Sequence, residues 1–212
     1  MLWRSLGAAL KNNRVTITIS LLCLIGFLLV ALLRGSFAGI NANVNAWAET
    51  IHTSFFTPTA MLVADGFETT SLLAFSLVMG AVLFLLKMKK NALLLVGAMA
   101  GNTVILEALK TFIYSPRPLN RLVLETDNSF PSGHVTSTVV LFGLLAFFAW
   151  QIWKNTRVKA VSGVLVAVLT LLVGFTRIYL NVHWFSDVIG AVFLGAFWLT
   201  FSMMLERALS ES

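Results

Sequence analysis

Charged side chains are scarce in this sequence. Asp, Glu, Lys and Arg make up 11% of its 212 residues and hydrophobic residues 58%, whereas a soluble globular domain carries about 25% charged residues. Several apolar runs approach the length of about 20 residues that a helix needs to cross the hydrocarbon core of a bilayer. The composition therefore excludes an ordinary soluble domain and predicts an integral membrane protein.

Cysteine is almost missing as well. Cys23 is the only one in the sequence and lies in the first apolar run, so an intramolecular disulfide is excluded. We interpret it as a small buried hydrophobic residue. The chain also lacks internal repeats and low-complexity segments, and its length suits one domain. We expect residues 1–212 to form a single membrane-embedded domain.

The apolar runs predict an all-α bundle of six transmembrane helices. The first run is too long for a cleaved signal peptide. Thr57 and Pro58 have the pattern of an N-cap followed by a proline at the helix start, so the second helix is expected to be long, tilted and partly above the lipid at Asp65 and Glu68. The longest connection is 35–57. The six predicted spans are Val15–Leu33, Pro58–Leu86, Asn91–Leu109, Val135–Trp153, Ala160–Phe175 and Trp184–Leu205.

The Lys and Arg residues are distributed unequally between the two faces that six crossings define. Ten fall on one face and five on the other, so the positive-inside rule places the richer face, with both termini, in the cytoplasm. The net charge of +6 then reflects topology signals that meet anionic headgroups, and no nucleic-acid partner is expected. The ten are Arg4, Lys11, Arg14, Lys87, Lys89, Lys90, Lys154, Arg157, Lys159 and Arg207.

Three further polar stretches reach the outer face in this topology. KTFIYSPRP (residues 110–118) ends the third span, PSGH (131–134) opens the fourth, and TRIYLNVHWFSD (176–187) connects the fifth and sixth. They are distant in the sequence, so their arrival at one face points to a single site.

These stretches gather groups that bind phosphate. Lys110, Arg117 and Arg177 supply three fixed cations, and the guanidinium fork matches phosphate oxygens. The backbone N–H groups at the start of a helix also favour an anion. Within PSGH, Gly133 permits close approach of the backbone, and Ser132 can cap the helix or donate to a phosphate oxygen.

Two histidines add groups suited to catalysis. His183 and Asp187 are four residues apart, a spacing that puts both on one helix face. The carboxylate can hold the proton of one ring nitrogen and leave the other free to attack, while His134 could protonate a leaving oxygen. Phosphoryl transfer to histidine and then to water would need no metal, because the cations neutralise the charge that Mg²⁺ otherwise handles. The Asp187 pairing favours His183 as the nucleophile without proving it.

The order and spacing of these residues closely resemble the type 2 phosphatidic acid phosphatase superfamily, which includes lipid phosphate phosphatases and soluble acid phosphatases. The shared pattern is Lys, six residues, Arg-Pro; then Pro-Ser-Gly-His; then Arg, five residues, His, three residues, Asp, and it covers residues 110–187. The six-span layout is similar to that of small membrane members. Thr176 stands where the family usually has Ser, and this departure keeps the hydroxyl.

The resemblance implies a function and a role for each residue. It implies hydrolysis of a lipid phosphate or diphosphate at the outer leaflet of a cell membrane, through a phosphohistidine and without a metal or other cofactor. Family members act on phosphatidylglycerophosphate, phosphatidate and isoprenoid diphosphates such as undecaprenyl diphosphate, and the motifs leave this choice open. His183 would be the nucleophile, Asp187 its orienting partner and His134 the general acid, with phosphate bound by Lys110, Arg117, Ser132, Gly133 and Arg177.

Two other functions are weighed against this one. An anion transporter or channel could use intramembrane charges, but its site is expected near the midplane of the membrane. A vanadium-dependent oxidase is a second alternative, because the soluble haloperoxidases have similar motifs. The apolar architecture of this chain counts against it. The expected partners are the lipid substrate and the surrounding membrane lipids, and the sequence does not indicate an oligomeric state.

Other polar and small residues have simpler interpretations. Glu125 and Asp127 are expected in a solvated loop. Arg121 is expected there too, although it could reach a lipid headgroup, and His52 is interpreted as a loop histidine. Gly97 and Gly101 are four residues apart, which predicts close packing of the third span against another helix.

Overall fold

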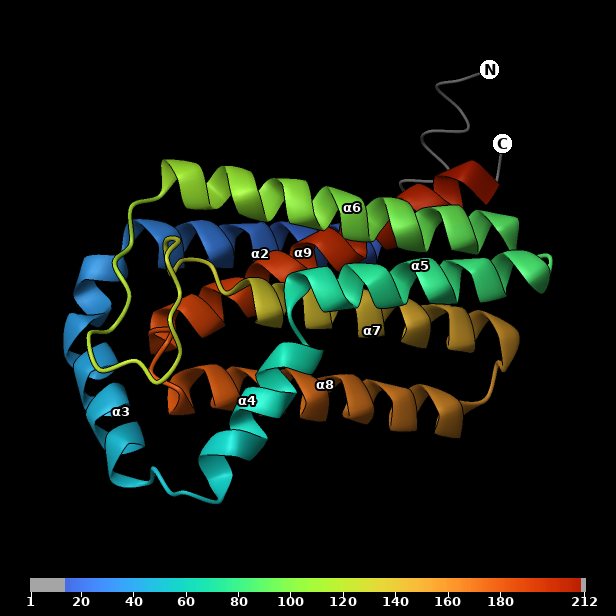
Figure 1. Cartoon of the computed structure of the whole chain (residues 1–212). Coiled ribbons are helices and arrows are strands. Elements are labelled where there is room, and N and C mark those ends of the chain that lie inside the picture. Colours follow the sequence, from blue (N-terminus) through green and yellow to red (C-terminus); the bar gives the residue numbers. More distant parts are fainter. Residues whose placement is uncertain (1–13, 211–212) are drawn as a thin grey trace.

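The computed structural model describes residues 14–210, and most of its long helices run along one common axis (Figure 1). Five helices are long and apolar enough to cross a membrane, and α4 and α5 would together make a sixth crossing. The predicted all-α, multi-pass membrane fold is therefore confirmed. The elements are α2 (Arg14–Leu32), η1 (Arg34–Phe37), α3 (Ala38–Thr50), α4 (Phe56–Gly66), α5 (Thr69–Leu85), α6 (Lys89–Phe112), α7 (Gly133–Ile152), α8 (Thr156–Tyr179) and α9 (Phe185–Ser210).

The second predicted span is not one long tilted helix. It is divided into α4 and α5, which are bent by 51° at the break. Gly66 ends α4, and Glu68 has an extended backbone (φ −60°, ψ 147°) before α5. Glycine is a weak helix former, so the helix breaks at this point. α4 also begins before Pro58, at Phe56, whose N–H donates to the Thr53 hydroxyl at 3.0 Å.

The ends of α8 depart from the sequence prediction because hydrophobicity does not set them. The helix extends beyond the predicted Ala160–Phe175 at both ends. Its start is fixed by Asn155, whose side chain accepts a hydrogen bond from the Arg157 N–H at 2.8 Å. Its last turn carries Arg177, a charged residue that a hydrophobicity criterion would place outside the span.

α7 is the central helix of the bundle. It packs against α6, α8 and α9, while α2 lies along α9 and α5 along α6. Two thirds of its most apolar window is buried, whereas the outer helices expose large apolar side chains such as Leu22, Val78 and Leu171. In a membrane these exposed side chains face lipid. α7 is instead surrounded by other helices, and this packing fixes the position of the PSGH motif at its start.

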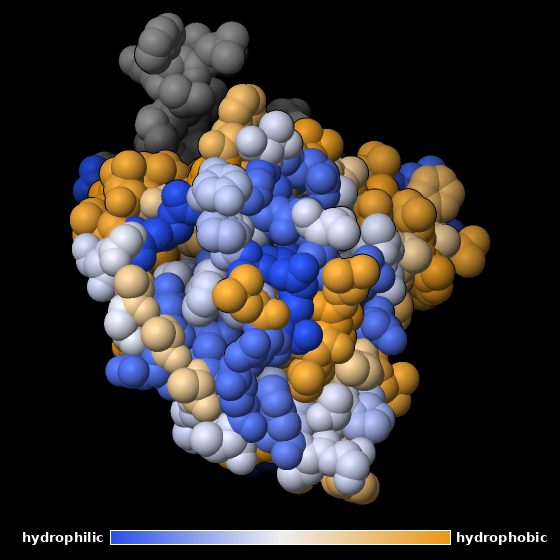
Figure 2. Space-filling view, turned by 60° about the vertical axis from the view of Figure 1, so that its left-hand side comes forward, coloured by the Kyte–Doolittle hydropathy of each residue, from blue (hydrophilic) through white to orange (hydrophobic). Residues whose placement is uncertain are grey.

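The two ends of the bundle differ in charge and in structure. The start of α2 and the α5–α6 and α7–α8 connections lie together at one end, with the end of α9 (Figure 1), and these segments hold the described members of the ten-cation set. Arg4 and Lys11 lie outside the described residues. The opposite end is formed by α3 and the 113–132 loop, and hydrophilic residues gather across it (Figure 2).

Only one of the two glycines in the third span is required by packing. A Cβ atom on Gly101 would lie 2.8 Å from Cζ2 of Trp198 in α9, whereas one on Gly97 would meet nothing within 4 Å. The Trp198 ring is held in place, because its Nε1–H donates to the Ala98 carbonyl at 2.8 Å. The prediction of close packing is therefore confirmed for Gly101 and wrong for Gly97.

We expect Gly101→Ala to lower the thermal unfolding midpoint of the detergent-solubilised protein. Overpacking costs about 1–3 kcal/mol, and the anchored indole leaves the new methyl group little room. Gly97→Ala is the matched control on the same helix, and it should keep or raise the midpoint, because alanine favours a helix by about 0.5–1 kcal/mol over glycine. Equal midpoints for the two variants would contradict this packing.

Candidate active site

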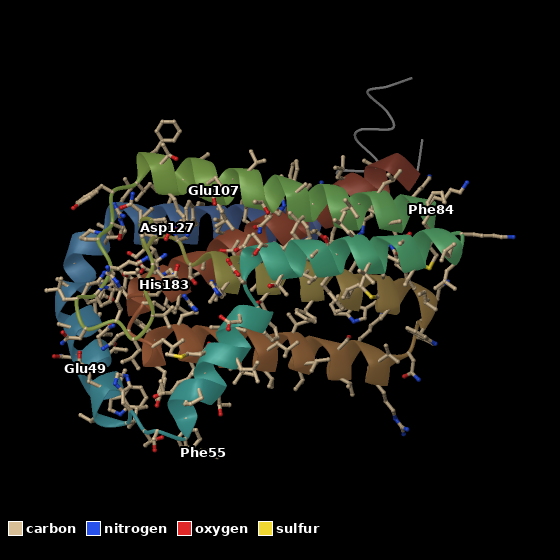
Figure 3. The ribbon with its side chains drawn as sticks, in the orientation of Figure 1. Glu49, Phe55, Phe84, Glu107, Asp127 and His183 are labelled. Atoms are coloured by element: carbon tan, nitrogen blue, oxygen red, sulfur yellow. The ribbon has the colours of Figure 1, made fainter. Side chains whose placement is uncertain are left out.

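The structure brings all the sequence-predicted site residues to the end of the bundle that holds α3 and the 113–132 loop. Asp127 and His183 lie near each other there, far from Phe84 at the other end (Figure 3). The last turns of α6 and α8 supply Lys110 and Arg177. The other members are Arg117 in the loop, Ser132, Gly133 and His134 at the start of α7, His183 just before α9 and Asp187 in the first turn of α9.

His183 and Asp187 are in contact, although not on one face of a helix as expected. α9 begins at Phe185, so His183 lies in the turn before it. His183 Nδ1 lies 3.4 Å from Asp187 Oδ2, and the same oxygen accepts a hydrogen bond from the Trp184 N–H at 2.9 Å. The carboxylate thus ties down the turn as well as the ring, and both side chains are almost completely buried.

The second ring nitrogen of His183 faces a cation. Its Nε2 lies 3.3 Å from Nη1 of Arg117, which also donates to the Val182 carbonyl at 2.7 Å. Burial lowers the pKa of His183 well below its ordinary value, and the charges of Arg117 and Arg177 lower it further. The ring is therefore neutral, with a proton on Nδ1 toward Asp187 and a lone pair on Nε2.

One face of α3 holds the turn that carries His183. Asn45 donates to the Asn181 side-chain oxygen at 2.9 Å, and Asn41 both donates to the Ser186 hydroxyl and accepts from its N–H, each at 3.0 Å. Glu49 accepts from the Asn181 amide at 2.9 Å. The sequence predicts only a connection here, although the spacing of the polar residues at 41, 45 and 49 is a usable signal for one polar face of a helix.

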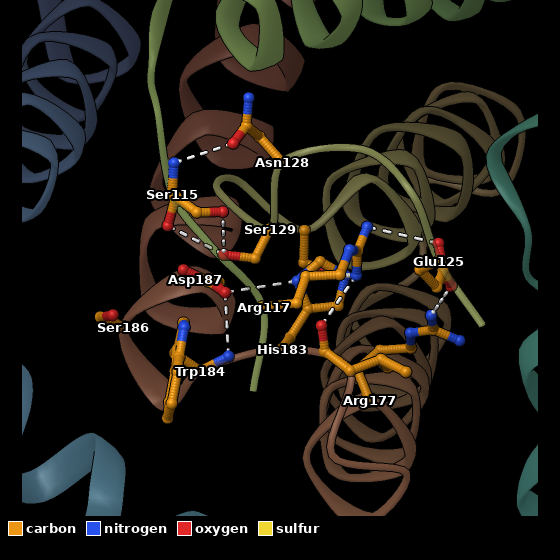
Figure 4. A network of polar contacts seen from close by, with 12 residues as sticks. Ser115, Arg117, Glu125, Asn128, Ser129, Arg177, His183, Trp184, Ser186 and Asp187 are labelled. Atoms are coloured by element: carbon orange, nitrogen blue, oxygen red, sulfur yellow. Dashed lines mark hydrogen bonds and ion pairs between the residues drawn. The ribbon is translucent and has the colours of Figure 1, made fainter. Parts of the chain in front are cut away.

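The predicted phosphate-binding cations are joined by two acidic residues. Figure 4 shows one of them, Glu125, between Arg117 and Arg177. Asp127 pairs with Lys110 and, at 2.6 Å, with Nη2 of Arg117, which also lies 3.3 Å from Glu125. Glu125 pairs in turn with Arg177. Partial burial raises the pKa of Asp127, but the hydrogen bonds and charges of Lys110 and Arg117 outweigh this and hold it below its ordinary value. Both acids lie in the loop between α6 and α7, and Asp127 is exposed there as expected. The sequence did not predict their ion pairs, which arise because buried guanidinium groups require partners.

The PSGH segment supplies a free hydroxyl group. Ser132 is the N-cap of α7, yet its side chain makes no capping bond, and its buried Oγ has no hydrogen-bond partner among the described residues. The same holds for Nε of Arg177. Gly133 allows a close approach as expected, but the neighbour is protein, because a Cβ atom there would lie 2.8 Å from the Thr69 hydroxyl of α5. Two buried donors thus remain available to an anion.

His134 is held by α4. Its ring lies beside the backbone of Ala64 and within electrostatic reach of Arg177, Lys110 and Arg117. Within the described residues, no hydrogen bond links the His134 ring to His183. The bend between α4 and α5 therefore contributes to the site, because it places the end of α4 against this ring.

Two further polar residues, His52 and Arg121, lie in loops at this end of the bundle. His52 lies in the connection between α3 and α4, as interpreted, and its Nε2 lies 2.6 Å from the Tyr179 carbonyl at the end of α8. Arg121 lines an open pocket of about 560 Å³ above Arg117, Glu125 and Asp127. Residues 14–210 contain no group of three His, Cys, Asp or Glu side chains arranged to hold a metal ion.

Comparison with known proteins places this architecture in a family. Residues 91–210, which include all three motifs, match the PAP2 superfamily model, so the chain belongs to the PAP2 superfamily. It is 30% identical to phosphatidylglycerophosphatase B of Bacillus subtilis (strain 168) over 126 residues, 58% of this chain and 62% of the relative. It is 35% identical to an undecaprenyl-diphosphatase of Sulfolobus acidocaldarius over 99 residues, 45% of this chain and 39% of that protein.

A solved structure confirms the fold beyond the motifs. The crystal structure of a transmembrane PAP2 type phosphatidylglycerolphosphate phosphatase from Bacillus subtilis superimposes with a TM-score of 0.83 at 22% identity. The match covers 89% of this chain and 96% of that one. The sequence alignments span less than two thirds of the curated relatives, whereas the structural match extends over nearly the whole neighbour.

We expect His183 to stay neutral when the pH falls through 6.5, because its pKa in the folded protein lies well below that value. The sequence contains only three histidines, so nitrogen NMR of protein labelled at histidine should resolve them. His183→Gln and His134→Gln variants would assign the signals. A His183 signal that titrates near pH 6.5 would contradict the buried, cation-flanked ring.

Proposed function

We propose that this chain is a membrane phosphatase that removes a terminal phosphate from a lipid phosphate or diphosphate through a phosphohistidine intermediate. The observation that carries the proposal is the arrangement around His183. Asp187 lies at Nδ1, and Nε2 faces Arg117 within a set of three cations. A neutral imidazole with one nitrogen held by a carboxylate and the other directed at a phosphate-binding cation is suited to attack phosphorus.

In the proposed reaction the phosphoryl group moves to the protein and then to water. The Nε2 lone pair of His183 forms a bond to phosphorus, and the bond from phosphorus to the leaving oxygen breaks. That oxygen belongs to the lipid alcohol of a monophosphate or bridges the two phosphates of a diphosphate, and His134 gives it a proton. A water molecule then attacks the phosphohistidine, His134 takes its proton, and inorganic phosphate leaves. Charge on the transferring group is stabilised by the cations and by the free donors of Ser132 and Arg177, with Gly133 at the N-terminus of α7 adding backbone N–H groups.

The substrate class follows from the family and from the membrane. Relatives carry the names phosphatidylglycerophosphatase and undecaprenyl-diphosphatase, so we propose phosphatidylglycerophosphate, phosphatidate or an isoprenoid diphosphate as candidates for this chain. The site lies at one end of the bundle (Figure 3), where the headgroup of a membrane lipid would be. A transporter would need such charges midway along the helices, so the placement favours an enzyme.

We expect the two histidine variants to differ in their response to the leaving group. His134→Ala should lose much more activity on a lipid monophosphate than on p-nitrophenyl phosphate, because general acid catalysis contributes roughly 10²–10⁴ in rate and a good leaving group needs it less. His183→Ala should be inactive on both, and Asp187→Asn should fall between. The measurement is kcat/KM for each substrate, in excess chelator because no metal is expected to be needed.

The opposite pattern would reverse the roles. If His183→Ala were the variant selectively rescued by the better leaving group, His134 would be the nucleophile. Activity that vanished with chelator and returned with a divalent ion would contradict a mechanism based on the protein's own cations.

We also propose that the active site faces away from the cytoplasm of a cell membrane, since cations gather at the opposite end. Leu119 is 93% exposed at the site end, and Lys154 is exposed in the α7–α8 connection. In a Cys23→Ser background, Leu119→Cys should react with an impermeant thiol reagent added outside intact cells. Lys154→Cys, the matched position at the other end, should react only after the membrane is opened. Reversed labelling would overturn this orientation.

A further inference from the structure

We propose that Glu125 and Asp127 set the minimum negative charge that an anion needs in order to bind at this site. The two carboxylates act as internal counter-anions that a ligand must displace, and this requirement keeps out the singly charged phosphodiesters of ordinary membrane lipids while terminal phosphate groups can still bind. The inference rests on the proposed function, since it concerns how that site selects its substrate.

The carboxylates occupy the same cationic groups that a phosphate would use. Nη2 of Arg117 lies 2.6 Å from Asp127 and 3.3 Å from Glu125, and Glu125 also binds Nη2 of Arg177. Both guanidinium side chains are almost fully buried. A phosphate that bound them bidentately would compete with these contacts directly.

The charges decide which ligands can compete. The three cations and two carboxylates leave a net charge of +1 around the neutral His183. Every anion that enters must separate the same ion pairs, so the displacement penalty is common to all. A phosphodiester brings one negative charge, whereas a terminal phosphate brings about two at neutral pH, so its attraction to the freed cations is roughly double. The common penalty therefore removes binding of the weaker ligand first.

The position of the two acids allows them to move without unfolding the bundle. Both lie in the loop between α6 and α7, beside the open pocket of about 560 Å³ that Arg121 also lines. The Asp127 side chain is 43% exposed, so it can rotate toward solvent. Nε of Arg117 holds the Asp127 carbonyl at 3.0 Å, which keeps the loop attached when the carboxylate leaves. His183 is 1% exposed and its Nε2 faces Arg117, so a ligand that reaches Nε2 also meets the guanidinium group that the carboxylates occupy.

Neutralising both carboxylates tests the inference. The double variant Glu125→Gln, Asp127→Asn keeps the side-chain shapes and removes the charges. The matched control is Glu107→Gln, which removes an exposed charge three residues before Lys110. Hydrolysis of phosphatidate in mixed micelles is measured with inorganic phosphate or phosphatidylglycerol, a phosphodiester lipid, as competitor.

We expect the inhibition constants of both competitors to fall by the same factor in the double variant, about tenfold or more, because both escape one penalty. Phosphatidylglycerol should become an inhibitor at micellar fractions that the wild type and the control tolerate, and KM for phosphatidate should fall. Unchanged inhibition constants would overturn the inference, since the two acids would then have no effect on anion binding. Inhibition constants and KM that rise together would also overturn it, since the acids would then position the cations for the ligand.

Two controls keep this outcome separate from other failures. A wild-type protein without phosphatase activity would contradict the proposed function, and inorganic phosphate titrated calorimetrically into wild type and double variant would still show whether the carboxylates compete with an anion. If the double variant did not fold, Glu125→Gln alone should give a smaller shift in the same direction, because Glu125 joins Arg117 and Arg177.

Discussion

The need to neutralise cations buried at one end of a membrane bundle organises much of this structure. The guanidinium groups of Arg117 and Arg177 are almost fully buried, and an unpaired buried charge costs several kcal/mol. Glu125 and Asp127 meet that need from a loop. The same ion pairs attach the 113–132 loop to Lys110 of α6 and Arg177 of α8. The loop in turn places Arg117 against His183.

The remaining architecture holds this charged layer on a rigid apolar base. α7 is the most buried span, and it delivers Ser132 and Gly133 at its start. α4 reaches His134 because the second crossing is bent, and α3 fixes the turn before α9 through asparagine side chains. The candidate site residues at the ends of helices thus gain their positions from packing deeper in the bundle, which supports precise geometry better than a loop alone would.

Membership of the PAP2 superfamily explains why these motifs recur together, and the geometry explains what each contributes. A histidine oriented by a carboxylate needs no bound metal to present a lone pair. In the proposed reaction, three cations and two free donors would give a phosphoryl group its contacts. In the proposed function the motifs would contact only the phosphate, so the choice of lipid would depend on other features. Residues such as Arg121, at the mouth of the pocket, are therefore where we expect differences in substrate preference to arise.

The sequence alone determined the membrane character, five of the crossings, the end of the bundle that carries the candidate site and the residues that gather there. Composition and the spacing of motifs depend on local properties, and both are visible in one chain. Tertiary structure decided which side chains contact each other. In the sequence Glu125 and Asp127 have the pattern of solvated acids, whereas the fold places them beside buried arginines. Asn41 and Asn45 lie in an apparent connecting segment, whereas α3 packs against the turn that carries His183. Gly97 and Gly101 are alike in sequence, and only the position of Trp198 separates them. Such pairings join residues far apart along the chain, so their energies depend on distances that no local pattern encodes.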